Sequence, residues 1–195
     1  MVYRIGYIIG SLAGDSINRV LAKALVRLAP DSLELSEIPI RDLPLYNRDD
    51  ELSPVAAVTD FKQAIEASDG LLFVSPEYNR SIPGALKNAI DWGSRPWGHN
   101  SFARKPTGII GASTGAIGTA LMQSSMRGVL SFLNAPQLNA PEAYITFKPE
   151  LYGPDGEVHD EATAKFLRHY MHEYAAFVER VLSIALPGHV GDRDE

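Results

Sequence analysis

The sequence contains no cysteine and no cluster of basic residues. The first absence excludes disulfides, cysteine-ligated zinc, iron–sulfur clusters and a thiol nucleophile. The second, with a formal net charge of −6 from 18 basic and 24 acidic side chains, argues against nucleic acid as the main partner. No apolar run approaches the ~20 residues of a membrane helix, and the first residues lack a signal-peptide pattern. We therefore predict a cytoplasmic protein without membrane insertion.

The chain is short enough for one domain and apolar enough for a sizeable core. It has 195 residues, of which 45% are hydrophobic. We find no internal repeat, low-complexity tract or interdomain linker in it. The prediction is a single domain over residues 1–195, in which 187–195 form a frayed tail.

Apolar segments with the features of strands alternate with segments of helical periodicity. The predicted strands are 3–9, 32–36, 70–75, 107–112 and 143–147, and the predicted helices are 17–29, 54–68, 81–92, 119–134 and 160–185. Segment 32–36 alternates polar and apolar residues, which is typical of a half-exposed edge strand. Regular alternation of strand and helix predicts a doubly wound α/β fold with a five-stranded parallel sheet.

Three loops should meet at one edge of such a sheet, because they follow its first, third and fourth strands. Open α/β sheets bind their ligands at this edge. The first loop, 10–18, contains Ser11, Ser16 and Asn18 and ends at a helix start, where free N–H groups attract anions. It can equally be read as a capped helix start with polar loop residues. A P-loop is excluded because no Gly-Lys-Ser/Thr ending is present.

A long motif after the third strand carries the strongest functional signal. It reads Ser75-Pro-Glu-Tyr-Asn-Arg-Ser-Ile-Pro-Gly-Ala-Leu-Lys-Asn-Ala-Ile-Asp-Trp92, with Ser81 as the predicted helix N-cap and Pro83 in the first turn. The motif resembles the signature of the NADPH-dependent FMN reductases, the flavodoxin-like group that includes bacterial quinone and chromate reductases. The likeness extends from the first strand to about residue 134.

This resemblance implies a flavodoxin-like fold with strand order 2-1-3-4-5 and helices on both faces of the sheet. It also implies an enzyme with bound FMN that takes electrons from NADPH or NADH and passes them to a quinone or similar small acceptor in a ping-pong reaction. The flavin carries the chemistry, so no catalytic side chain is required. Members of the group are typically homodimers or homotetramers.

The resemblance also assigns site residues. The FMN phosphate would lie at the first loop, at Ser11, Ser16, Ile17 and Asn18, where the family pattern is Ser-x-Arg-x-x-Ser-x-Asn. The isoalloxazine ring would lie against Pro76, Glu77, Tyr78 and Asn79, and close to Ser113, Thr114, Gly115 and Gly118. The sequence departs from the pattern in three places: Ala13 replaces the arginine, Asp15 adds a negative charge, and Thr119 replaces a second glycine.

Two other functions fit parts of the sequence. The fold alone would suit a flavodoxin-type electron carrier without NAD(P)H turnover. Gly111-Ala-Ser-Thr-Gly115 matches the G-x-S-x-G pattern of a serine esterase, for which the possible triad partners are His159, His169, His172, Asp155 and Asp160. His169 and His172 have a spacing that can chelate a metal, but they more simply belong to a solvated helix face, and we predict no metal site.

Overall fold

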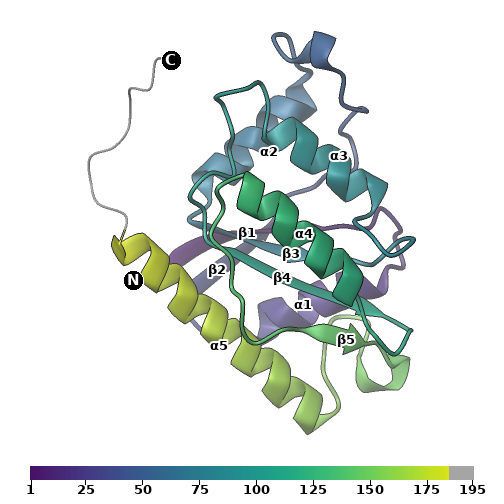
Figure 1. The fold of residues 1–195 in the computed structure, drawn as a ribbon. Coiled ribbons are helices and arrows are strands. Elements are labelled where there is room, and N and C mark those ends of the chain that lie inside the picture. Colours follow the sequence, from purple (N-terminus) through teal and green to yellow (C-terminus); the bar gives the residue numbers. More distant parts are fainter. Residues whose placement is uncertain (185–195) are drawn as a thin grey trace.

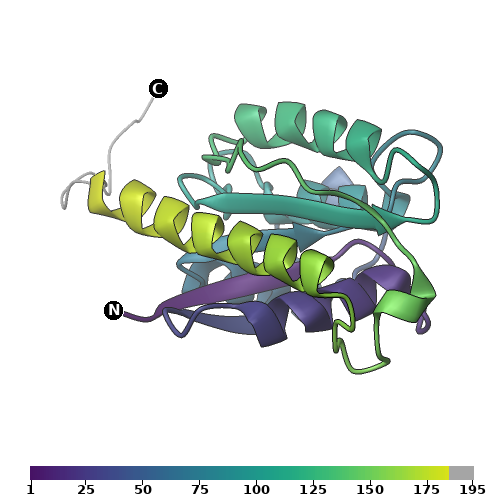
Figure 2. The same cartoon turned by 90° about the horizontal axis from the view of Figure 1, so that it is seen from below.

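The computed structural model describes residues 1–184; the predicted tail 187–195 lies outside them. A five-stranded sheet forms the middle of three layers, and its strand order is β2-β1-β3-β4-β5 (Figures 1 and 2). All neighbouring strands are parallel. The strands are Tyr3–Ile9 (β1), Leu33–Glu37 (β2), Gly70–Val74 (β3), Thr107–Ser113 (β4) and Tyr144–Thr146 (β5). The fold class and strand order predicted from the sequence are therefore confirmed.

Helices cover both faces of the sheet. They are Ile17–Leu28 (α1), Ala56–Ala67 (α2), Gly84–Gly93 (α3), Ala120–Phe132 (α4) and Glu161–Ile184 (α5). In Figure 1, α1 and α5 lie on one side of the strands, and α2, α3 and α4 lie on the other. Consecutive residues of β3 alternate between the two cores: Leu72 packs with α1 and α5, and Phe73 packs with the other three helices.

The long helix α5 is anchored to the sheet by two buried tyrosines. Tyr170 donates its hydroxyl hydrogen to the carbonyl of Ile109 at 2.9 Å, and Tyr174 donates to Leu71 at 2.8 Å. Burial raises the pKa of both phenols, so they stay protonated and able to donate. These bonds fix the central strands whose ends carry the candidate site.

Several predicted boundaries shift in the structure. The helix predicted from residue 54 begins at Ala56, and its N-cap residue Val55 has no side-chain cap. The helix predicted from Ser81 begins at Gly84, with Pro83 at the N-cap position. The predicted loop between β2 and α2 contains a 3₁₀ helix, Arg48–Asp50, and another, Pro149–Leu151, follows β5. Within residues 1–184 no helix is both long and apolar enough to span a membrane.

Candidate functional site

The loops after β1, β3 and β4 gather at the carboxyl edge of the sheet, at the right of Figure 1. We call residues 10–16 the first loop, 75–83 the second loop and 114–119 the third loop. Glycines let them approach closely. A Cβ atom on Gly10 would lie 2.2 Å from the hydroxyl oxygen of Ser75, and one on Gly111 would lie 2.0 Å from the Ser75 carbonyl oxygen. The predicted convergence of the three loops is therefore present.

The first loop presents backbone donors at the start of α1. Its shape is set by two serines: the hydroxyl of Ser11 accepts from the N–H of Ala13, and that of Ser16 caps α1 by accepting from the N–H of Asn18, both at 3.3 Å. Within residues 1–184, five backbone N–H groups here find no acceptor, those of Ser11, Leu12, Gly14, Asp15 and Ile17. A row of free N–H groups at a helix N-terminus fits a phosphate.

Asn18 joins the first loop to β4 rather than offering its amide freely to a ligand. Its Nδ2 donates to the carbonyl of Ala112 at 2.9 Å, and its Oδ1 accepts from the N–H of Ala112 at 2.8 Å. Asn18 is 1% exposed. This side chain therefore positions α1 and its free N–H groups against the end of β4.

The second loop is a tight two-residue turn. Tyr78 and Ser81 exchange two backbone hydrogen bonds, of 3.2 and 3.0 Å, across Asn79 and Arg80. Both central residues have positive φ, 52° and 64°, as a type I′ turn requires. Ser81 is thus part of the turn, which explains why it is not the N-cap of α3. The turn leaves Tyr78 half-exposed at the sheet edge.

Glu77 points its side chain toward α4. One carboxylate oxygen accepts from the N–H groups of Leu121 and Met122, at 2.9 and 3.0 Å, and the other pairs with Arg80 at 3.3 Å. The side chain is 7% exposed. Because α4 has no acidic residue in its first turn and no side-chain cap of its own, Glu77 supplies the negative charge that a helix N-terminus favours. The lack of an acidic residue in the first turn of α4 is the sequence signal that could have revealed this role.

The third loop is closed by Ser113 and Gly118. The Ser113 hydroxyl accepts from the N–H of Gly115 at 3.0 Å. Gly118 has a φ of +56°, and a Cβ there would lie 2.7 Å from the backbone of Tyr144, so this position requires glycine. Thr114 and Gly115 are exposed at the edge. Within residues 1–184 no histidine is hydrogen-bonded to Ser113, so the esterase hypothesis finds no triad here.

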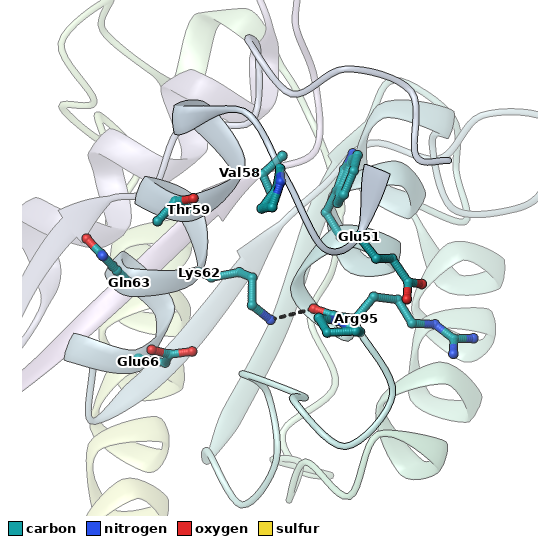
Figure 3. A pocket seen from close by; sticks show the side chains of 10 residues that line it. Glu51, Val58, Thr59, Lys62, Gln63, Glu66 and Arg95 are labelled. Carbon is teal, nitrogen blue, oxygen red and sulfur yellow. Dashed lines mark hydrogen bonds between the residues drawn. The ribbon is translucent and has the colours of Figure 1, made fainter. Parts of the chain in front are cut away.

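A separate pocket of about 290 Å³ lies beside α2 (Figure 3). Its lining residues are Glu51, Pro54, Val58, Thr59, Lys62, Gln63, Glu66, Trp92, Arg95 and Pro96. The ammonium of Lys62 donates to the carbonyls of Arg95 and His99 at 2.8 Å and to that of Gly93 at 3.2 Å. Burial lowers the pKa of Lys62. Lys62 thus ties the segment after α3 to α2, and this pocket takes no residue from the three loops.

Comparisons with known proteins agree with this geometry. The family described as NADPH-dependent FMN reductase matches residues 3–150. The chain is 46% identical to a 2-hydroxy-1,4-benzoquinone reductase of a Burkholderia species, over 91% of this chain and 97% of the relative. It is 44% identical to a quinone reductase of Pseudomonas putida, over 91% and 96% of the two chains.

A solved structure extends the likeness to three dimensions. The flavoenzyme NAD(P)H:(acceptor) oxidoreductase FerB of Paracoccus denitrificans is 43% identical, with a TM-score of 0.89 over 92% of this chain and 98% of that chain. The resemblance predicted from the motif 75–92 is confirmed, and it extends well beyond residue 134. The chain belongs to the NADPH-dependent FMN reductase family.

Proposed function

We propose that the three loops form one FMN site, with the phosphate at the first loop and the isoalloxazine ring against the second and third. The observation that carries this placement is the contrast between two helix N-termini at the same edge. The start of α4 already holds the carboxylate of Glu77, whereas the start of α1 has free N–H groups. A phosphate is therefore best accommodated at α1.

The protein residues would bind and orient the cofactor. Ser11, Ser16 and Asn18 hold the first loop in its donor-rich shape. In the second loop, the backbone N–H groups of Glu77 and Asn79 have no acceptor within residues 1–184, so they are available to the polar edge of the ring. When bound, FMN supplies the transfer of hydride from NADPH and of two electrons to the acceptor.

We further propose that the acceptor is a quinone or a similar small molecule. Two relatives that match over most of this chain bear the names 2-hydroxy-1,4-benzoquinone reductase and quinone reductase. If the nicotinamide and the quinone use the same face of the flavin in turn, steady-state kinetics with NADPH and a benzoquinone should be ping-pong. Intersecting lines in double-reciprocal plots would contradict a shared site.

Flavin analysis tests the cofactor and its phosphate end. The purified protein should contain or take up non-covalent FMN in preference to FAD, because a terminal phosphate suits the start of α1. Denaturing release followed by chromatography identifies the flavin. Adding NADPH without oxygen should bleach the yellow protein rapidly, whereas a flavodoxin-type carrier would stay oxidised. A preference for FAD would contradict the proposed phosphate site.

Assembly and location stay predictions, namely a homodimer or homotetramer in the cytoplasm. One surface feature supports assembly: Trp97 and Phe132, 76% and 73% exposed, flank a pocket of about 320 Å³. Large exposed aromatic side chains are enriched in subunit contacts. Light scattering after size-exclusion chromatography measures the oligomeric state, and a monomer would contradict the prediction.

A further inference from the structure

An arginine from a different part of the chain lies against the first loop. Arg41 belongs to the segment between β2 and α2, and it is exposed. Its Nη2 donates a hydrogen bond to the backbone carbonyl of Leu12, 29 residues earlier in the sequence. This contact places a guanidinium group beside the loop that carries the free N–H groups.

Arg41 differs from the neighbouring arginines in having no acidic partner in the part of the chain that the structure describes. Within residues 1–184 no carboxylate is paired with it, and the acceptor of its hydrogen bond is a neutral carbonyl. The other arginines around the site differ. Arg19, in the first turn of α1, pairs with both oxygens of Glu37 at 3.0 and 2.9 Å, and Arg80 pairs with Glu77. Because a guanidinium has five N–H donors, Arg41 keeps both its charge and further donors available.

The first loop needs such a cation if it binds a phosphate monoester. A helix N-terminus contributes only about half a positive charge, whereas a phosphate monoester near pH 7 carries between one and two negative charges. Ala13 is neutral, and Asp15 adds an opposing charge. We propose that Arg41 binds the 5′-phosphate of FMN and supplies the positive charge that Ala13 does not. This inference rests on the proposed function, since it presumes that FMN binds at the first loop.

The guanidinium of Arg41 could instead bind a different phosphate, namely the 2′-phosphate of NADPH. The structure favours FMN, because Arg41 contacts Leu12, which itself has one of the free N–H groups. One group of donors would then surround one phosphate. The experiment therefore has to distinguish binding of the FMN 5′-phosphate from binding of the NADPH 2′-phosphate.

The test uses the apo-protein titrated with FMN and, in parallel, with riboflavin, which lacks the phosphate. Binding is followed by flavin fluorescence. Arg41→Ala should weaken FMN about tenfold, because it removes a charge-assisted hydrogen bond at an exposed site. Riboflavin binding should change less than about twofold. Arg48→Ala is the matched control, an exposed arginine of the same segment without a contact to the first loop.

A compensating substitution sharpens the test. Ala13→Arg in the Arg41→Ala background should recover most of the lost FMN affinity, because it returns one cation to the loop. The same substitution in the wild-type protein should gain less, since Arg41 already serves the phosphate. This non-additivity is what two groups sharing one ligand produce.

Three results would overturn the assignment. Equal loss of FMN and riboflavin affinity in Arg41→Ala would mean that Arg41 supports the loop and not the phosphate. An unchanged FMN affinity would remove Arg41 from the site. A rise in the KM for NADPH relative to NADH, with unchanged FMN affinity, would assign Arg41 to the 2′-phosphate. If the wild-type apo-protein bound no FMN at all, the proposed function would fail together with this inference; otherwise only the role of Arg41 is at stake.

Discussion

The first and second loops lie at the same edge of the sheet, but each is held in place differently. The first is shaped by local hydrogen bonds to Ser11 and Ser16 and by Asn18, which docks α1 onto Ala112 of β4, and several of its backbone N–H groups stay free. The second sends the carboxylate of Glu77 to the start of α4. The difference shows that two helix N-termini at one sheet edge can be satisfied differently: the start of α4 is capped internally and orders a loop, whereas the start of α1 keeps free N–H groups, which the proposed FMN site would use.

The strongest test of this comparison removes the anchor of the first loop. Asn18→Ala leaves the N–H and the carbonyl of Ala112 without partners in a buried place. Each such loss costs roughly 1–3 kcal/mol, so we expect the free energy of unfolding to fall by about 3 kcal/mol. Urea denaturation of the apo-protein measures it. Asn139→Ala is the control, because Asn139 is exposed; equal effects of the two would disprove the anchoring role.

The second test removes the connection from the second loop to α4. Glu77→Ala deletes the cap on Leu121 and Met122, and we expect a loss of about 1.5 kcal/mol in the free energy of unfolding. Glu77→Gln keeps an acceptor oxygen and should lose about half as much. If the Gln and Ala variants were equally destabilised, the charge of Glu77 and not its hydrogen bonds would hold the loop.

A smaller effect is expected from adding a cation to the first loop. Ala13→Arg should tighten FMN by at most ~1 kcal/mol in the wild-type protein, after the cost of ordering the side chain. Titration of the apo-protein with FMN measures the gain. Weaker FMN binding in this variant would contradict the placement of the phosphate at the first loop.

The smallest effect is expected from removing the negative charge of that loop. Asp15→Asn should tighten FMN by a few tenths of a kcal/mol, because Asp15 is exposed and solvent screens its repulsion. The gain should shrink as salt is added. Asp31→Asn, an exposed change between α1 and β2, should leave FMN affinity unchanged. A loss of affinity in Asp15→Asn would mean that Asp15 helps to build the site.

The sequence predicted which loops meet at the edge of the sheet, but it did not predict several contacts that their residues make there. The motif 75–92 identified the family, but it predicted Ser81 as a helix cap and did not indicate what the Glu77 side chain contacts. In the structure the Glu77 carboxylate caps α4, and Ser81 closes a turn. The resemblance assigned Asn18 to the phosphate loop, and it did not indicate that the amide of Asn18 binds β4. These hydrogen bonds are tertiary or turn contacts, which the periodicity of the sequence does not predict.

What the sequence by itself determined is the fold class, the strand order and the family. The fold class follows from apolar segments with strand or helix periodicity. The family follows from one contiguous motif, and the strand order is what the resemblance to that family implies. The tertiary structure alone decided which helix start is satisfied and which cation lies at the first loop. Asn18 and Ala112 are 94 residues apart, Glu77 and Leu121 are 44 apart, and Arg41 and Leu12 are 29 apart. Such contacts exist only once parallel strands bring their carboxyl ends to one edge, because the loops that meet there are distant in the chain.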